Sequence, residues 1–197
     1  RIIYLPFDHL HRDYGALKGA DPKSDLIVFV ESARMTTGRN WHKERLFFLL
    51  SSARHFAKSL ELEGFTVEYV KAATTIDGIK SVLKKHRGLP IICAEPSSFR
   101  QFAALQEFGV EFVENDFFLT PRPLFKSWAD SQKSYLMESF YRKQRVRLNI
   151  LMDGNEPAGG AWNFDKENRL PPPKKYEGPK YLEHQRDAID LEVAAEL

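Results

Sequence analysis

Short apolar runs alternate with amphipathic stretches over the first 116 residues of the chain. Apolar runs of this length are typical of parallel strands that are covered on both faces. Repeated strand–helix–strand units predict an α/β fold, a Rossmann-like, doubly wound sheet of five parallel strands. The expected strands are residues 1–7, 25–31, 66–72, 89–95 and 110–116, and the expected helices are residues 41–63, 76–87 and 97–108.

The helix over residues 41–63 has the clearest periodicity. Its apolar side chains recur at three- and four-residue spacing, which places them on one face of the helix. Gly64 follows them, and glycine is the commonest residue just beyond a helix end. The apolar positions are Leu46, Leu49, Leu50, Ala53, Phe56, Ala57 and Leu60.

The alternation of strands and helices stops after residue 116. Pro121 and Pro123 predict an irregular segment over residues 117–130, because proline breaks a helix interior. We therefore expect two parts, a Rossmann-like domain over residues 1–130 and a helical and extended connector over residues 131–197. Within the connector, the pattern predicts a helix at 131–149, a hairpin turn near 153–155, an extended segment at 171–180 and a helix at 182–196.

Composition narrows the class of protein. A chain of 197 residues with 43% hydrophobic side chains can bury a full core without disulfides. The net charge of +2 is too small to imply nucleic-acid binding. No apolar run reaches the roughly 18 residues of a membrane span, so we expect no membrane partner. Cys93 is the single cysteine, which indicates a reducing compartment, and we expect a cytoplasmic location.

No sequence motif assigns a chemical reaction. The chain contains no glycine-rich dinucleotide motif, no Walker-type phosphate loop and no Gly-x-Ser-x-Gly elbow. His9, His11 and His42 could bind a metal, but they lack a cysteine partner and the His-Glu-x-x-His spacing. We interpret them as solvated or capping side chains and predict neither catalytic nor metal-ligating residues.

A basic run covers residues 141–147 and contains Arg142, Lys143, Arg145 and Arg147. Such a run is either the solvated face of a helix or a track for a phosphate backbone. We favour the solvated face, because that is the usual outcome for charges clustered on a helix.

The expected topology locates a candidate ligand site. In open α/β sheets, ligands bind beyond the carboxyl ends of the strands, where the strand order reverses. Asp8 follows the first expected strand, and Glu31 and Glu95 end the second and the fourth. These carboxylates either contact a ligand or are structural anions near helix ends.

Four stretches carry a resemblance to a known family. They are "HFAKSLELEGFTVEYV", "AEPSSFR", "KSYLMESFYRKQR" and, as the most specific, "LMDGNEPAGGAWNFDKENRLP". Together they resemble the amino-terminal half of the photolyase-related proteins, the bacterial cryptochromes and (6-4) photolyases that carry an iron–sulfur cluster. The resemblance covers residues 1–175.

The resemblance implies a light-harvesting role for the α/β domain, which in this family binds 6,7-dimethyl-8-ribityllumazine as an antenna chromophore. A connector then leads to a helical domain that holds FAD, the iron–sulfur cluster and the DNA-lesion pocket. One cysteine cannot supply the four ligands of such a cluster, so we expect FAD, cluster and DNA to bind only in that missing domain. The chain alone should catalyse nothing, and the full-length protein should be a DNA photolyase or a cryptochrome.

The resemblance also implies which residues form the antenna site. Leu46 and Leu49 would form its apolar wall, and Phe7 departs from the family, which commonly has glycine at that position. The site is therefore either reshaped or empty, and an empty site would make the chain a free-standing α/β scaffold or nucleotide-binding domain. The implied site residues are Asp8, Leu10, Glu31, His42, Lys43, Leu46, Leu49, Glu95 and Pro96.

The motif near the end of the chain has an expected structural role. Trp162 and Phe164 each offer a large apolar surface, and we expect both to anchor this segment on the sheet domain. The polar side chains around them would satisfy backbone groups in a segment that has no strand ladder of its own. These side chains are Asn163, Asp165, Asn168 and Arg169.

Overall fold

The computed structural model describes residues 1–165, 170–180, 182 and 184–197. The chain forms two compact units. The first, here called the sheet unit, comprises Arg1–Leu119 together with Gln185–Leu197, and the second, the connecting unit, comprises Thr120–His184. Asn168 and Arg169, for which the sequence predicts backbone hydrogen bonds, lie outside the described residues.

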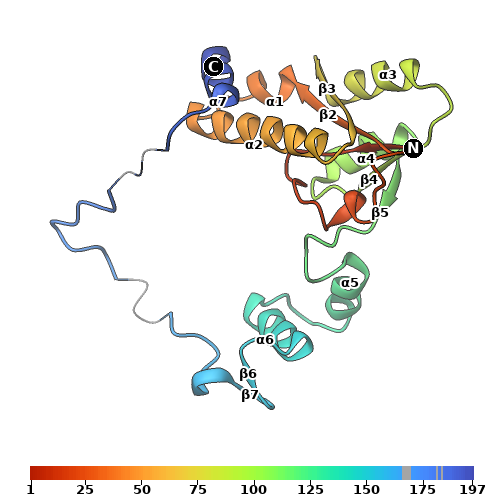
Figure 1. The fold of residues 1–197 in the computed structure, drawn as a ribbon. Helices are drawn as coiled ribbons and strands as arrows, with labels where there is room; N and C mark the ends of the chain where they lie inside the picture. The colour runs from red at the N-terminus through yellow and green to blue at the C-terminus, as the bar shows by residue number, and fades with distance from the viewer. Residues whose placement is uncertain (166–169, 181, 183) are drawn as a thin grey trace. The chain divides into compact units, whose positions relative to one another are not determined.

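The sheet unit is built on five parallel strands, which confirms the predicted fold class (Figure 1). Their spatial order is β3-β2-β1-β4-β5, so the order reverses between β1 and β4. β2 and β3 pair over their full lengths, from Leu26 opposite Thr66 to Ser32 opposite Ala72. The strands are β1 Ile2–Tyr4, β2 Leu26–Ser32, β3 Thr66–Ala72, β4 Ile91–Ala94 and β5 Glu111–Val113.

Helices cover both faces of this sheet. Side chains alternate between the faces, so Val28 of β2 contributes to one apolar core and Phe29 to the other. The Val28 core is closed by α3 (Thr75–Lys85) and α4 (Phe99–Glu107). The Phe29 core is closed by α2 (Lys43–Leu62) and by the short 3-10 helix Gly15–Leu17. Two covered faces explain why the strand sequences are almost continuously apolar.

Side chains of N-cap residues mark where three of the helices begin. The Oγ1 of Thr74 accepts a hydrogen bond from the Asp77 amide at the start of α3, and the Oγ of Ser98 accepts one from the Gln101 amide at the start of α4. The Nδ1 of His42 accepts from the Glu44 amide at the start of α2. These bonds satisfy amide groups that have no partner inside the first helical turn.

The final helix returns to the sheet unit. α7 (Ala188–Glu196) begins later than the sequence predicts, because Asp187 caps it and forms a capping box with Asp190. Val193 is fully buried, whereas Leu182, which we expected on the same helical face, is 75% exposed and precedes the helix. α7 packs beside α2 (Figure 1).

The connecting unit contains a helix that the sequence analysis missed. α5 (Arg122–Asp130) begins immediately after Pro121 and carries Pro123 in its first turn. Proline is tolerated in a first turn because the amide it lacks has no helical acceptor there, so our prediction of an irregular segment is wrong. α6 (Met137–Leu148) follows, and then the predicted hairpin of β6 (Met152–Asp153) and β7 (Glu156–Pro157).

Trp162 is held within the connecting unit by α6. The guanidinium groups of Arg142 and Arg145 lie 5.4 and 5.2 Å from the centre of its ring. Arg145 is buried and donates to the carbonyl oxygens of Trp162, Ile150 and Leu151. Phe164 is 70% exposed, so the prediction of a buried aromatic anchor is wrong for this ring.

Gly78 allows α3 to approach the sheet closely. A Cβ atom at this position would lie 2.4 Å from Cγ1 and 2.9 Å from Cγ2 of Val30. We expect Gly78→Ala to lower the free energy of unfolding by about 1–2 kcal/mol, because overpacking outweighs the better helix propensity of alanine. Urea unfolding measures the effect. Lys84→Ala, at an exposed position of the same helix, is the control, and an unchanged midpoint for Gly78→Ala would contradict this packing.

No helix within the described residues is both long and apolar enough to cross a membrane.

Candidate functional site

A cavity of about 700 Å³ opens at the carboxyl ends of the strands in the sheet unit. Pro6, Phe7 and Asp8 reach it directly after β1, and Ser32 at the end of β2. Segments after β3 and β4 complete it, and the strand order reverses between β1 and β4. The cavity therefore lies at the sheet edge that the topology predicts.

Aromatic and aliphatic side chains make most of the cavity wall. Tyr4 is buried, and its hydroxyl accepts a hydrogen bond from Nε2 of Gln101 at 3.4 Å. Burial raises the pKa of Tyr4, so the phenol is neutral. Trp41 and Leu49 contribute further apolar surface. A volume of this size is typical of a small-molecule site.

Phe7 does not fill the cavity. Its ring packs into an aromatic cluster with Phe29 and Tyr69, whose centres lie 6.5 and 6.1 Å from its own. The ring thus forms one side of the cavity and leaves its volume open.

The rim of the cavity is cationic. Four arginines and one carboxylate, that of Asp8, line it. The guanidinium of Arg45 lies 4.3 Å from the centre of the Trp41 ring, and that of Arg39 lies 5.7 Å from it. The other two arginines are Arg34 and Arg100.

Comparison with known proteins identifies the family. A family model described as "Deoxyribodipyrimidine photo-lyase-related protein" matches residues 3–197. The chain belongs to this family.

Two curated relatives of this photolyase-related chain differ in length. A (6-4) photolyase of Agrobacterium fabrum is 32% identical over 205 residues, which cover 98% of this chain and 40% of that protein. An uncharacterized protein of Acanthamoeba polyphaga mimivirus is 25% identical over 187 residues, which cover 88% of this chain and 90% of that protein. The chain thus spans about two fifths of the first relative and nearly all of the second.

The cavity brings together only part of the residue set that the sequence suggested. Asp8 and Leu49 line it. His42 caps α2, Lys43 is exposed in the first turn of that helix, and Leu46 is buried against the fold. These three lie on the same helix as Leu49 without forming the cavity wall.

Three other residues of that set, Leu10, Glu95 and Pro96, contact the rest of the sheet unit and do not line the cavity. Leu10 packs against the apolar core on the α2 side of the sheet. The Glu95 amide donates to the carbonyl oxygen of Val113, and the Glu95 carbonyl oxygen accepts from Nδ2 of Asn115 at 2.7 Å. Pro96 follows and is buried. The segment after β4 is therefore fixed by its contacts with β5 and the residues beyond it.

Sequence reasoning missed most of the polar cavity lining. Thr74 and Ser98 could have been found, because each is an N-cap residue that follows a strand and so must lie at the carboxyl edge of the sheet. The arginines had no such signal, because their spacing in sequence does not show that four of them surround one cavity. They are Arg34, Arg39, Arg45 and Arg100.

Glu31 faces α2 and forms a buried ion pair. Both its oxygens lie 3.0 Å from Nη2 of Arg54, and Oε2 also accepts from the Tyr69 hydroxyl at 2.7 Å. Arg54 in turn donates to Glu192 at 3.1 Å and to Glu196 at 2.5 Å on α7. We call Glu31, Arg54, Glu192 and Glu196 the α7 ion cluster.

Two members of the α7 ion cluster have pKa values that are shifted toward the charged form, Arg54 and Glu196. Burial alone would lower the pKa of Arg54, but hydrogen bonds to Glu196 and Glu31 raise it. The hydrogen bonds from Arg54 and Lys71 lower the pKa of Glu196 to about 2. Arg54 and Glu196 are therefore both charged near neutral pH, and their ion pair joins α2 to α7.

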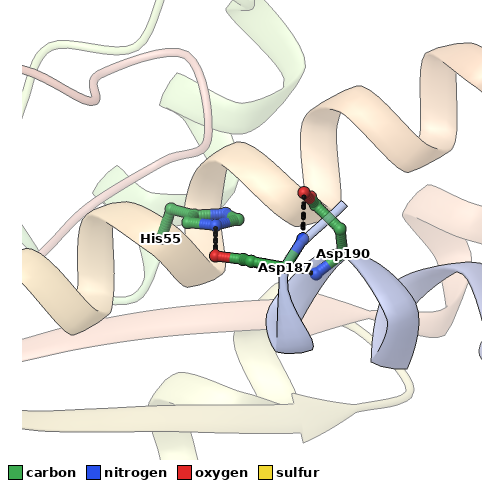
Figure 2. A group of neighbouring side chains, drawn as sticks. All are labelled: His55, Asp187 and Asp190. Carbon is green, nitrogen blue, oxygen red and sulfur yellow. Dashed lines mark hydrogen bonds and ion pairs between the residues drawn. The ribbon is translucent and has the colours of Figure 1, made fainter. Parts of the chain in front are cut away.

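A second group of polar side chains joins the same two helices (Figure 2). Nε2 of His55 lies 2.8 Å from Oδ2 of Asp187, and the ligand atoms of His55, Asp187 and Asp190 lie within 4.8 Å of one another. This spacing could hold a metal ion. Each carboxylate already has partners, however. Asp190 accepts from Ser51 Oγ at 2.5 Å, and the two aspartates form the capping box of α7.

The contact between His55 and Asp187 should make the stability of the sheet unit depend on pH. The hydrogen bond to Asp187 raises the pKa of His55 above its ordinary value of 6.5. A raised pKa in the folded state means that the protonated histidine adds stability below the ordinary pKa, and that this stability is lost as the pH rises through the raised value.

We expect the free energy of unfolding to fall as the pH rises above the ordinary histidine pKa and through the raised pKa of His55, and His55→Gln to remove part of that fall. Denaturant unfolding at several pH values measures it. Asp187→Asn should remove the same component while keeping an N-cap acceptor for α7, and an unaltered pH profile in both variants would refute the contact.

Proposed function

We propose that this chain is the antenna domain of a photolyase-related flavoprotein and binds a flat, light-absorbing chromophore in the cavity at the carboxyl edge of its sheet. The observation that carries this proposal is the cavity itself, which has a volume of about 700 Å³ and aromatic walls. Such a volume falls within the roughly 300–1,000 Å³ of small-molecule sites.

The lining fits a ribityl pigment such as 6,7-dimethyl-8-ribityllumazine. Tyr4, Trp41 and Leu49 offer apolar surface for a fused ring system. Thr75, Ser98 and Gln101 offer hydroxyl and amide groups for a polyol chain. When bound, such a pigment would absorb light and pass the excitation on by resonance transfer. The task of these side chains is to hold the ring in one position and orientation and to keep water from it.

Catalysis is proposed for a longer protein rather than for this chain. The (6-4) photolyase relative is matched over only 40% of its length. In the proposed parent protein, a helical domain would hold FAD and an iron–sulfur cluster and would bind DNA for light-driven repair or blue-light sensing. This chain has one cysteine, and that residue is buried in β4, so it does not supply the cluster ligands.

A free-standing α/β domain is the second candidate. It is supported by the viral relative, which is matched over 90% of its own length. In that case the cavity would serve a ligand without transfer of excitation to a flavin, and the domain would act as a binding module.

Titration of the purified protein with 6,7-dimethyl-8-ribityllumazine tests the antenna proposal. We expect saturable binding of one pigment per chain, seen as a shift in the pigment's absorption and a rise in the melting temperature. Transfer is then tested in the longer parent protein, where the bound flavin should quench the fluorescence of the pigment. Failure of the chain to bind any ribityl pigment would refute the antenna role, and binding without transfer would favour the free-standing module.

A further inference from the structure

We propose that His55, Asp187 and Asp190 form a binding site for a divalent transition-metal ion such as Zn²⁺, which fastens α7 to α2. In the described part of the chain, the ligand atoms of these three side chains lie within 4.8 Å of one another (Figure 2). The site is separate from the cavity at the edge of the sheet, and none of its three residues lines that cavity. Metal binding here is therefore independent of the proposed function.

Two helices bring the side chains together. Ser51 and His55 lie four residues apart on α2, so they share one face of that helix. Asp187 and Asp190 are the N-cap and N3 residues of α7, and each uses one carboxylate oxygen in the capping box. The second oxygen of each carboxylate contacts α2, that of Asp187 at His55 and that of Asp190 at Ser51. One oxygen per carboxylate can thus bind a metal while the cap of α7 stays intact.

The hydrogen bonds of His55 determine which ring nitrogen can be a metal ligand. Nδ1 lies 2.8 Å from the carbonyl oxygen of Ser51, and a carbonyl oxygen only accepts, so Nδ1 carries a hydrogen. In the neutral ring, Nε2 then has a lone pair directed at the Asp187 carboxylate, 2.8 Å away. A metal-bound histidine usually donates its other ring N–H to a backbone carbonyl or a carboxylate in this way.

Two acceptors that face each other need a cation between them. The pKa of Asp187 is lowered, first by the hydrogen bond from the Asp190 amide, so this carboxylate is ionised near neutral pH. Its contact with Nε2 of a neutral His55 would be repulsive, because neither atom has a hydrogen to donate. A proton on His55 or a metal ion removes this repulsion, and the metal ion also meets the second carboxylate, that of Asp190.

The ligand set favours zinc over magnesium and calcium. Zn²⁺ accepts one imidazole nitrogen and two carboxylate oxygens, whereas Mg²⁺ and Ca²⁺ prefer oxygen ligands alone. Zinc bonds to these atoms are about 2.0–2.2 Å long, so two ligand atoms of a tetrahedral site lie roughly 3.4 Å apart. His55 and Asp187 are both partly exposed, so small rotations of their side chains reach that spacing and leave a position for water.

Ser51 positions two of the three ligands. Its side chain is buried, and its Oγ donates to Oδ1 of Asp190 at 2.5 Å. Its carbonyl oxygen holds the His55 ring through Nδ1. Partners of this kind fix the orientation of metal ligands, and their loss typically lowers metal affinity 10–100-fold.

Metal titration of the purified chain, freed of any affinity tag and treated with chelator, tests the proposal. We expect one Zn²⁺ to bind per chain in isothermal titration calorimetry. Zinc should raise the melting temperature more than Mg²⁺ does at the same concentration. Hydrogen exchange of the α7 amides should slow when zinc is added, because the ion joins this helix to α2. EDTA should reverse both effects.

Substitutions locate the ion. His55→Gln and Asp190→Asn should each lower the zinc affinity by at least about a hundredfold, and Ser51→Ala by about tenfold, since a direct ligand contributes more than its supporting partner. Asparagine at position 190 keeps an acceptor for the capping box. His86→Gln is the matched control, because His86 also contacts a carboxylate, that of Glu68, and lies outside the site. Circular dichroism in EDTA shows whether each variant is folded.

Four results would overturn the proposal. The first is the absence of saturable binding below about 1 mM Zn²⁺. The second is zinc affinity that survives in both His55→Gln and Asp190→Asn, and the third is an equal loss of affinity in His86→Gln. The fourth is equal stabilisation by Mg²⁺, which would mean that the carboxylates attract cations without the imidazole. None of these results bears on pigment binding in the cavity.

Discussion

Arg54→Met is expected to lower the free energy of unfolding of the sheet unit by about 3–5 kcal/mol, the usual cost of leaving one partner of a buried ion pair uncompensated. Arg54 and Glu31 each have only 9% of their side chain exposed. Methionine keeps much of the volume and removes the charge, so Glu31 would remain buried with the Tyr69 hydroxyl at 2.7 Å and the Lys71 ammonium at 4.0 Å as its remaining partners. Denaturant unfolding followed by tryptophan fluorescence and circular dichroism measures the loss.

Two further variants distinguish the buried charge from simple loss of a contact. Arg54→Met combined with Glu31→Gln should recover much of the stability, because glutamine still accepts from Tyr69 and carries no charge. Lys58→Met removes an exposed partner of Glu61 on the same helix and should cost less than about 1 kcal/mol. If Arg54→Met is no more destabilising than Lys58→Met, Glu31 is not held as an ion pair.

Leu49→Trp is expected to abolish chromophore binding while the protein remains folded. Leu49 is half-buried on α2 and lines the cavity, so a larger ring at this position projects into the space that the ligand needs. We expect an affinity loss of about a hundredfold, because displacing a ring system from its apolar wall removes more than a single contact. Absorption titration with 6,7-dimethyl-8-ribityllumazine measures the loss.

The control for this substitution lies on the same helix. Leu62 is 79% exposed at the last residue of α2, so Leu62→Trp adds the same ring outside the cavity and should leave binding unaltered. Melting temperatures of the two variants should lie close to that of the parent protein, since Leu49 faces an open space. Full retention of pigment by a folded Leu49→Trp protein would mean that this cavity is not the binding site.

Much of the fold is determined by the local sequence pattern. The apolar runs specify five strands because both faces of a parallel sheet are covered, and the glycine and capping residues specify where the helices end. The edge of the sheet that carries the cavity also follows, because the carboxyl ends of parallel strands meet there. The α5 helix was missed because the position of Pro123 within a helix, and not its presence, decides whether a helix forms.

The tertiary structure alone decides which charged residues meet. Glu31 lies one residue before the end of β2, close to the predicted strand end. Its side chain points to the α2 face and pairs with Arg54, because successive residues of a strand point to opposite faces and Ser32 takes the cavity side. Arg45 and Arg100 lie 55 positions apart in sequence and line one cavity. Long-range electrostatic pairings of this kind depend on the packing of separate elements, which no local periodicity encodes, whereas the five strands and the helices that cover their sheet follow from the local sequence pattern.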